Sequence, residues 1–466
     1  MSRHTDTIVA LSTPSGTGAL GVIRLSGPQA IVIVDRVFSR DLTQAPGHSL
    51  HYGRLLRAGE TLDEVVVSVF RAPRSYTRED VVEISCHGSP YILREALDVL
   101  VETGARLAGP GEFTQRAWLN GALDLAQAEA VADLIAARSA AAHRVALHQM
   151  RGGVSSALAQ LRQELVDFTA LIELELDFGE EDVEFADRSR LLALTDVLEA
   201  HLDRLIQSFR LGNALKSGVP TVILGKPNAG KSTLLNALLD ENRAIVSDIP
   251  GTTRDVIEDR LMIGGVEFRL MDTAGVRDTT DVIEAEGVQR SLDLARRADL
   301  VLYLFDATQE TPAQAMDYLL SLNLPKETFL IAAGNKADLI PDPAAYVEAH
   351  DQDTLGRPRL IYWLLISARQ GGNLKGLREL MLDAVEALGE TSTAQDTLIS
   401  HARHRDHLQQ AAAALQDVRA GLSSGLSGDL LSIDLRSAIH HIGQITGEIS
   451  TEEVLGSIFS KFCIGK

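Results

Sequence analysis

The spacing of apolar residues changes character along this 466-residue chain. In residues 1–120, apolar and polar positions alternate in short runs, which is typical of a mixed α/β domain. We expect four strands and two helices in this part of the chain. The strands cover residues 7–11, 19–25, 64–70 and 81–86, and the helices cover residues 28–38 and 89–102.

From residue 123 to residue 215 the apolar residues recur at every third or fourth position, which predicts helix throughout. Short buried-strand runs then follow over residues 221–224, 268–271 and 328–333, and helical spacing resumes after about residue 383. We therefore predict a multidomain α/β chain in which an α/β domain is inserted into a discontinuous helical domain. The predicted domains are residues 1–120, 121–217, 218–382 and 383–466, and the last of them has helices over residues 408–420, 433–445 and 451–459.

A phosphate-binding loop follows the first strand of the inserted domain. Residues 225–232 read Gly-Lys-Pro-Asn-Ala-Gly-Lys-Ser, and a helical segment begins at Ser232. In loops of this kind the glycines let backbone N–H groups approach phosphates, the Lys reaches the β and γ oxygens, and the Ser hydroxyl binds Mg²⁺. The N-terminus of the helix also favours an anion. Taken alone, the pattern is compatible with an ordinary strand-to-helix turn.

Three further motifs follow in order: Thr252-Thr253, Asp272-Thr273-Ala274-Gly275 and Asn335-Lys336-Ala337-Asp338. Asp272 ends an apolar run, where a carboxylate can hold Mg²⁺ through water. The Asp338 carboxylate can accept both N1–H and N2–H of guanine, a pair that adenine does not offer. Four motifs in this order predict a Ras-like guanine-nucleotide pocket. We expect the nucleotide and its ions to contact Asn228, Ala229, Gly230, Lys231, Ser232, Thr233, Ser247, Asp248, Ile249, Pro250, Gly251, Thr252, Thr253, Asp272, Thr273, Ala274, Gly275, Asn335, Lys336, Asp338, Ser367, Ala368 and Arg369.

The group that positions the attacking water is unusual. Ras-like switches place a Gln directly after Asp-x-x-Gly, but Val276 stands there in this chain. The carboxylates that could replace it are Asp278, Asp281, Glu284 and Glu286. A monovalent cation could offset charge in the transition state, since Asn228 and the carbonyls of residues 247–252 can supply oxygen ligands.

The composition limits the partners and the compartment. The net charge of −20 disfavours general attraction to a polyanion, so if RNA is the substrate we expect a basic partner to hold it. The chain has no apolar run of spanning length and no charged-then-apolar leader, and it has two cysteines. We therefore expect a protein of the reducing cytoplasm, neither membrane-spanning nor secreted.

Two other groupings have an ordinary structural explanation. Cys86 and His87 are neighbours on a predicted strand, so their side chains should point to opposite faces, and Cys86 should be a core thiol. His401, His404 and His407 have near-helical spacing, but intervening arginines disfavour a metal, and we expect a solvated helix face.

Several stretches together resemble the tRNA-modification GTPase family MnmE, also called TrmE. They are the phosphate loop, the switch residues 251–255, and residues 109–121, 123–130 and 462–466, the last of which end in Cys-Ile-Gly-Lys. The resemblance covers essentially the whole chain. It implies an N-terminal folate-binding α/β domain that also forms a homodimer, a discontinuous helical domain, and an inserted Ras-like P-loop GTPase domain.

The resemblance also implies roles for individual residues. Magnesium would be held by Ser232 and Thr253, with Lys231 at the phosphates, and Glu284 would orient water, with Glu286 as its nearest rival. Potassium would be held by Asn228, Ser247, Ile249 and Thr252. The folate, 5-formyltetrahydrofolate or a related form, would contact Arg24, Glu83, the residue at 122 and Lys466. This chain departs from the family at the third of these positions, where Ala122 replaces a basic residue.

The function that the resemblance implies is a potassium-activated GTPase acting with a flavin-dependent partner of the MnmG (GidA) type. Together they would add an aminomethyl or carboxymethylaminomethyl group at carbon 5 of the tRNA wobble uridine, using the one-carbon unit of the folate. Cys463 is either a nucleophile in this chemistry or part of a tail that delivers Lys466 to the folate. Two alternatives stay open: a regulatory or ribosome-associated GTPase without a role in modification, and a folate-dependent transferase with a vestigial GTP site.

Overall fold

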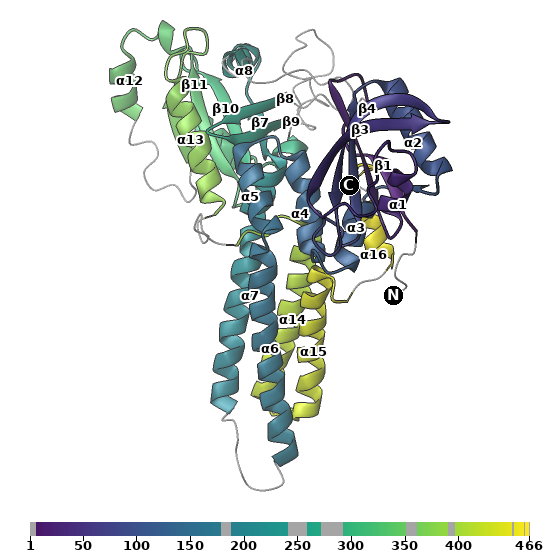
Figure 1. Ribbon diagram of the computed structural model, residues 1–466. Helices are drawn as coiled ribbons and strands as arrows, with labels where there is room; N and C mark the ends of the chain where they lie inside the picture. Colours follow the sequence, from purple (N-terminus) through teal and green to yellow (C-terminus); the bar gives the residue numbers. More distant parts are fainter. Residues whose placement is uncertain are drawn as a thin grey trace. The chain divides into compact units, whose positions relative to one another are not determined.

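The chain folds into two compact units, each built from segments that are far apart in the sequence. One unit contains residues 1–132, 149–159 and 440–466, and the other contains residues 133–148 and 160–439. The computed structural model describes residues 6–178, 188–240, 259–271, 292–350, 361–389, 397–449, 452–460 and 462–465. Figure 1 shows the elements of both units.

The first unit is built on a six-stranded sheet with the order β3-β4-β5-β2-β1-β6. Its strands are β1 (Ile8–Leu11), β2 (Leu20–Ser26), β3 (Ser49–Arg57), β4 (Glu60–Phe70), β5 (Val81–His87) and β6 (Arg106–Leu107). All neighbouring strands are antiparallel except β1 and β6. The four predicted strands are confirmed, whereas β3 and β6 escaped prediction. The strand β3 leaves Leu50 and Tyr52 exposed, which hides its alternation, and β6 has only two residues.

Helices α1 (Ala30–Asp35) and α2 (Pro90–Glu102) contribute to the hydrophobic core of this sheet and confirm the two predicted helices. The core consists of alternate residues of the central strands and one face of each helix. Cys86 lies in this core with no exposure, while His87 points outward and bonds the Asp63 carboxylate through Nδ1 at 2.7 Å. Burial, with a smaller effect of the Asp63 charge, raises the pKa of Cys86 to about 12. The prediction of a core thiol is therefore confirmed.

The helical elements occupy the regions where helical spacing predicted them. They are α3 (Glu112–Leu119), α4 (Leu125–Ala136), α5 (Ala140–Met150), α6 (Gly153–Phe178), α7 (Arg188–Ser217), α14 (Ala402–Ser424), α15 (Gly428–Thr446) and α16 (Glu452–Phe459). In Figure 1, α6, α7, α14 and α15 run side by side as long rods. Polar contacts join them between His201 and Glu164, Arg419 and Glu199, and Arg436 and Glu173.

The last helix and the tail belong to the first unit. Ile458, Phe459 and Phe462 are buried in a cluster with Leu125 and Ala128 of α4. The backbone at Ile464 then forms a bridge with Pro110. Residues 452–460 and 462–465 thus pack differently from the rest of the segment 383–466, because Ile458, Phe459 and Phe462 lie beside α4 and not along the long helices.

The second unit contains a six-stranded sheet with the order β12-β11-β10-β7-β9-β8. Its strands are β7 (Val219–Leu224), β8 (Asp259–Ile263), β9 (Val266–Met271), β10 (Leu300–Asp306), β11 (Phe329–Asn335) and β12 (Ile361–Leu365), all parallel except β8. The helices of this domain are α8 (Lys231–Asp240), α11 (Pro312–Ser321), α12 (Pro343–His350) and α13 (Leu374–Ala387). The boundary predicted at residue 382 falls inside α13, whose apolar face is buried as far as Val385.

A partly buried ion cluster joins the ends of the two helices that flank this sheet domain. Lys216 near the end of α7 contacts Asp133 of α4 at 2.8 Å, and His401 at the start of α14 contacts the same carboxylate at 2.7 Å. Burial alone would raise the pKa of Asp133, but the hydrogen bond and charge of His401, together with Lys216, hold this pKa below its ordinary value. The cluster therefore ties three helices at the entry to and exit from the inserted domain.

His404 contradicts the expectation of a solvated helix face, because its side chain is only 1% exposed. Its position on α14 faces the interior of the helical part. Among the described residues, no group of three or more His, Cys, Asp or Glu side chains is arranged to hold a metal. His404 is therefore part of the packing of α14, whereas His401 belongs to the Asp133 cluster.

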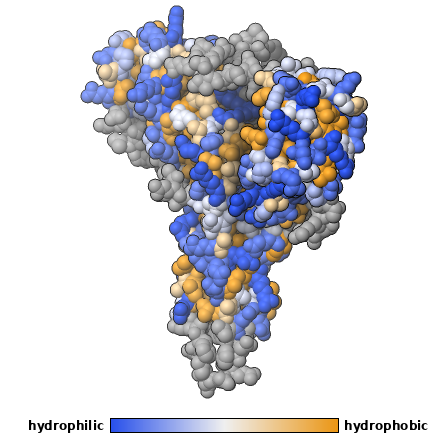
Figure 2. Space-filling view, in the orientation of Figure 1, coloured by the Kyte–Doolittle hydropathy of each residue, from blue (hydrophilic) through white to orange (hydrophobic). Residues whose placement is uncertain are grey.

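Figure 2 shows hydrophilic and hydrophobic residues intermingled over the visible face of the described helices. Within the described ranges, no helix is both long enough and apolar enough to cross a membrane.

We predict that Asp133→Asn lowers the free energy of unfolding at pH 7 by about 2 kcal/mol, since it removes the charge shared by Lys216 and His401. The pKa of Asp133 is lower in the folded state than its ordinary value of 3.8. Its contribution is therefore present above that value and is lost as the pH falls through the folded pKa. Urea unfolding at pH values from 7 to 3 should show the difference between wild type and variant shrinking below about pH 4.

The matched control is Asp196→Asn, since Asp196 pairs with Arg419 while 57% of its side chain is exposed. We expect a change below about 0.5 kcal/mol for this exposed pair. Equal effects of the two substitutions would contradict the importance of the partly buried cluster.

Candidate functional site

The predicted phosphate loop lies between β7 and α8. Two of its glycines have no room for a side chain. A Cβ on Gly225 would lie 2.3 Å from the Leu304 carbonyl oxygen, and one on Gly230 would lie 2.3 Å from Asn335 Nδ2. The loop therefore packs its backbone directly on the ends of β10 and β11, and its position depends on these glycines.

Lys231 begins α8 and turns its ammonium group back over the loop. Its Nζ donates to the carbonyl oxygen of Gly225 at 2.5 Å and to that of Lys226 at 3.2 Å. Burial lowers the pKa of Lys231. A phosphate placed at the helix N-terminus would offer this ammonium stronger, charged acceptors than the two carbonyls. The arrangement is suited to binding a polyphosphate.

Asn335 joins the phosphate loop to the predicted base-contact loop. Its Nδ2 donates to the Ala229 carbonyl at 2.8 Å, and its Oδ1 accepts from the Ala368 backbone N–H at 2.9 Å. The side chain is 4% exposed, so both bonds are shielded from water. The structure thus brings together three segments that the sequence analysis assigned to one nucleotide site.

Asp338 lies in a short 3₁₀ turn, Ala337–Leu339, directly after β11. The Ser367 hydroxyl donates to its Oδ1 at 2.6 Å. Lys336 has a left-handed backbone, and its Nζ contacts Asp306 Oδ2 at 2.6 Å. These bonds hold the Asp338 carboxylate at the carboxyl edge of the parallel sheet, where open α/β sheets bind their ligands.

A second anchor of the phosphate loop was not predicted. Lys226 Nζ contacts Glu310 Oε2 at 2.7 Å, and the Tyr303 hydroxyl donates to the same carboxylate at 3.2 Å. Glu310 is buried, and burial together with the Glu310 charge raises the pKa of Tyr303. No local sequence signal indicates this contact, because Lys226 and Glu310 are 84 positions apart.

Several predicted site residues lie outside the described residues, so their geometry is not part of the site described here. They are Ser247, Asp248, Ile249, Pro250, Gly251, Thr252, Thr253, Asp272, Thr273, Ala274, Gly275, Glu284 and Lys466. Of the remaining nucleotide residues, Ser232, Thr233 and Arg369 are exposed beside the loops described above. Asn228 has a left-handed backbone with φ 64° at the exposed tip of the phosphate loop.

A separate polar group lies on the first sheet, where Arg24 of β2 faces Glu83 of β5 in register. The Arg24 guanidinium donates to Glu83 Oε1 through Nε at 2.8 Å and Nη2 at 2.7 Å. The guanidinium carbon also lies 5.4 Å from the ring centre of Tyr76 and 5.8 Å from that of Phe113. The structure therefore brings two predicted folate residues together and adds two aromatic rings that the sequence analysis did not single out.

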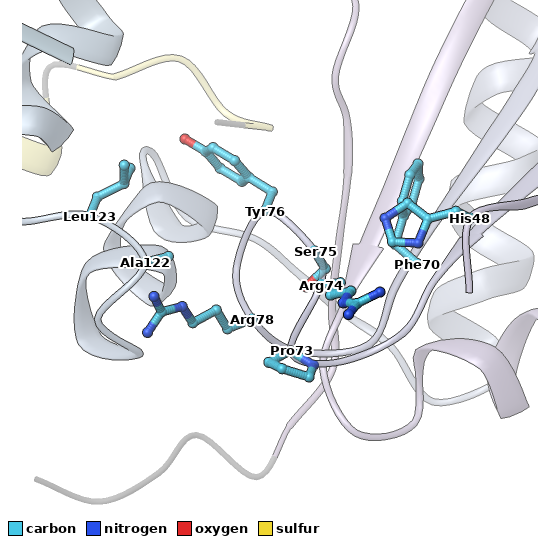
Figure 3. A pocket seen from close by; sticks show the side chains of 9 residues that line it. All are labelled: His48, Phe70, Pro73, Arg74, Ser75, Tyr76, Arg78, Ala122 and Leu123. Atoms are coloured by element: carbon cyan, nitrogen blue, oxygen red, sulfur yellow. The ribbon is translucent and has the colours of Figure 1, made fainter. Parts of the chain in front are cut away.

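Tyr76 also lines an open cleft of about 650 Å³ (Figure 3). Arg74, Arg78, Ala122 and Leu123 line the same cleft. Burial raises the pKa of Tyr76, so its phenol is neutral, and it bonds the Thr114 hydroxyl at 2.9 Å. The cleft runs from the aromatic ring beside Arg24 to the position at which a basic residue was expected.

The C-terminal tail lies against the same unit. The Gly111 backbone N–H donates to the Cys463 carbonyl at 3.4 Å, and the Ser12 hydroxyl donates to the Gly465 carbonyl at 3.3 Å. Cys463 is an exposed free thiol. Residues 463–465 therefore lie beside the N-terminal sheet, and the predicted role of Lys466, which lies outside the described residues, stays a prediction.

The loop that receives the tail is held by a buried ion network. Arg116 is fully buried and contacts Asp6 at 2.8 Å and Glu112 at 3.1 Å. Glu112 also accepts from Arg106 at 2.5 Å and from the Gly109 backbone N–H at 2.8 Å. Burial would raise the pKa of Glu112, but Arg106, Gly109 and Arg116 together lower it. This network fixes Glu112 and Arg116, the two charged residues of the stretch 109–116.

The phosphate loop, the Asn335 bridge and the oriented Asp338 carboxylate, set at the edge of a mainly parallel sheet, define a P-loop protein of the GTPase class. Comparison with known proteins carries the assignment further. Residues 7–122 match the model of the GTP-binding protein TrmE N-terminus, and residues 125–463 match that of the MnmE helical domain. The chain belongs to the tRNA modification GTPase MnmE family.

Relatives that match the chain over nearly its whole length support the same family. The tRNA modification GTPase MnmE of Cytophaga hutchinsonii is 51% identical over 467 residues, which cover 100% of this chain and 99% of that protein. The protein of the same name from Flavobacterium johnsoniae is 47% identical and covers 99% of both chains. A structure of Era with MgGDPNP and 16S ribosomal RNA nucleotides is 26% identical over 42% of this chain and 65% of that one, with a TM-score of 0.27, and the assignment does not depend on it. The chain is thus a GTP-binding hydrolase of tRNA modification.

We predict that Asp338→Asn weakens GTP binding about 100-fold and favours xanthosine triphosphate, because an amide offers a donor where guanine requires a second acceptor. Titration of both nucleotides into wild type and variant measures the change. Ser367→Ala serves as the matched control, since it removes only the hydroxyl that orients Asp338. It should weaken GTP binding by less than about tenfold and keep the preference for guanine. Retained GTP preference in Asp338→Asn would contradict the assignment of the base site.

Proposed function

We propose that this chain is a potassium-activated GTPase that modifies carbon 5 of the tRNA wobble uridine with a flavin-dependent partner of the MnmG (GidA) type. The group added is an aminomethyl or carboxymethylaminomethyl group, and a folate supplies its one-carbon unit. The observation that carries the proposal is the presence of two different sites in one chain. One is the guanine-nucleotide site, and the other is the Arg24 and Glu83 pair beside an aromatic cleft.

The chemistry of the cleft residues fits a folate. The amino-pyrimidine edge of a pterin presents adjacent N–H donors, and the Glu83 carboxylate has acceptor sites beyond its two bonds to Arg24. Tyr76, which lines the cleft, offers a ring for the flat pterin, while the buried Phe113 ring supports the Arg24 guanidinium from the core side. The folate supplies a one-carbon unit when bound, while the residues of this chain bind it, orient it and limit the access of water.

Metal ions would bind at the nucleotide. Ser232 and Thr253 would hold Mg²⁺, and Asn228 would supply the side-chain oxygen for K⁺, with the carbonyls of residues 247–252 completing the site. In support, Asn228 lies at the exposed tip of the loop with a left-handed backbone that turns it out of the core. A cation there would offset the charge that develops as the γ-phosphate leaves.

The partner follows from the charge of the chain. A protein with a net charge of −20 gains little from approaching RNA, so the flavin-dependent partner would hold most of the tRNA backbone. The anticodon loop already presents its wobble base unpaired, so the modification chemistry needs little unstacking. Two copies of this chain would meet as a homodimer.

The position of the inserted domain supports coupling between GTP hydrolysis and the helices. α7 ends at Ser217 and β7 begins at Val219, while α14 begins at Ala402. The Asp133 cluster joins the ends of these two helices. A change in the loops at the nucleotide would therefore reach α7 through a short covalent connection, and α14 through the Asp133 cluster that joins it to α7.

The hydrolytic step is tested by Glu284→Ala. We expect GTP hydrolysis in potassium to fall by at least about 100-fold, with nucleotide affinity unchanged, since the carboxylate acts only on the attacking water. The same measurement in sodium should show a much lower wild-type rate. Glu286→Ala is the matched control, and it should keep most of the activity. If Glu286→Ala abolishes hydrolysis and Glu284→Ala does not, the roles of the two glutamates are reversed.

The tRNA reaction is tested by mass analysis of nucleosides from cells that lack the protein. Carbon 5 of the wobble uridine should be unmodified, and wild-type protein should restore the modification. Glu284→Ala should fail to restore it if hydrolysis drives the reaction. If the deleted strain still carried the modification at carbon 5, the result would instead favour a regulatory GTPase.

A further inference from the structure

Position 122 itself adds no positive charge to the cleft, because the residue there is Ala122, whereas the resemblance to the family implies a basic residue. Arg78 reaches the same place from another loop. Figure 3 shows its side chain extending toward the turn that carries Ala122. Arg78 Nη1 donates to the Asn120 carbonyl at 3.1 Å and lies 3.4 Å from the position of a Cβ on Gly121. The guanidinium therefore bonds the backbone of Asn120, which lies two positions before Ala122 in the same turn.

Two bonds hold the loop of Arg78 against this turn. Besides the bond from Arg78, Asn120 Nδ2 donates to the Thr77 carbonyl at 2.8 Å. Thr77 is fully buried and bonds Ser26 of β2 at 2.6 Å. The base of the Arg78 side chain is therefore fixed on the sheet, and its position beside residues 120–122 does not depend on a flexible surface loop.

The guanidinium is also exposed, and Arg78 lines the cleft. Its bond to Asn120 uses one of five N–H donors, and a guanidinium can bind a carboxylate through two parallel bonds. The carboxylates of the next two residues in sequence accept hydrogen bonds from other residues. Glu79 accepts from Ser26 at 2.7 Å, and Asp80 accepts from the Ala72 backbone N–H at 2.9 Å.

We propose that Arg78 supplies the positive charge that this cleft lacks at position 122, and that it binds a carboxylate of the glutamate moiety of the folate. The inference rests on the proposed folate site. The pterin would lie at the Arg24 and Glu83 end, and Tyr76 lines the path from there to Arg78. A folate has its ring at one end and its carboxylates at the other, which fits a ring site at Arg24 and Glu83, next to the cleft-lining Tyr76, and a carboxylate site at Arg78.

The backbone conformation at Arg78 allows a substitution that removes the side chain without straining the backbone. Arg78 has a left-handed conformation with φ 59°, which glycine adopts without strain. Arg78→Gly therefore removes the charge without straining the loop, and thermal unfolding will show that the variant is folded. Wild type and variant are titrated with 5-formyltetrahydrofolate and with 5-formyl-6-methyltetrahydropterin, which keeps the ring system but carries no carboxylate.

We expect Arg78→Gly to weaken the binding of 5-formyltetrahydrofolate about tenfold and to leave the binding of the pterin unchanged, because the lost bonds involve the glutamate alone. Ala122→Lys in the Arg78→Gly background should restore the affinity for the folate to within about threefold of wild type. The same Ala122→Lys change in the wild-type background should give less than about a threefold gain, since the charge is already present. Arg94→Ala, on the exposed face of α2, is the charge control and should change neither affinity.

Equal folate affinity of Arg78→Gly and wild type would overturn the role of Arg78 and leave the folate site standing. Equal loss of both ligands would also overturn it, because that result indicates a purely structural role in holding the turn. A large gain from Ala122→Lys in the wild-type background would show that the charge is missing from the site and would contradict the proposal. If wild type binds neither ligand, the proposed folate site itself is wrong.

Discussion

The side-chain amide of Asn335 is the contact on which the nucleotide site depends. One of its atoms donates to the Ala229 carbonyl of the phosphate loop, and the other accepts from Ala368 in the base-contact loop. It also closes against Gly230, where any side chain would collide with it. Because these bonds are buried, breaking either of them would leave an unsatisfied polar group away from water. The distance between the phosphate site and the base site is therefore set by one residue.

The ends of the inserted domain are held by charge as well as by packing. The Asp133 carboxylate forms ion pairs with Lys216, on the helix that precedes the domain, and with His401, at the start of the helix that follows it. The Ala141 backbone N–H also donates to the Gly265 carbonyl of the β8–β9 turn at 3.0 Å. The ion cluster therefore joins the helices that flank the sheet domain, and the bond to Gly265 joins the sheet domain to α5.

Much of the fold was predictable because local periodicity and burial agree. The strands around Val82 and Val222 and the helix around Leu165 show their period directly, and the structure confirms them. The prediction failed where burial depends on distant residues. The strand β3 has exposed apolar residues that conceal its alternation, and His404 is buried although its neighbours in sequence are charged. α16 was expected to lie with the helical domain, but its apolar face is buried beside α4.

The sequence by itself determined the nucleotide class, because the residues of each motif are adjacent and their spacing alone fixes the chemistry of the phosphate loop and of Asp338. Only the tertiary structure decided which distant residues support these motifs. Lys226 meets Glu310, and Arg78 meets the turn at Ala122, through loops that chain folding brings together. Such contacts have no local period or motif, since they depend on strand order and loop direction and not on the identity of neighbouring residues.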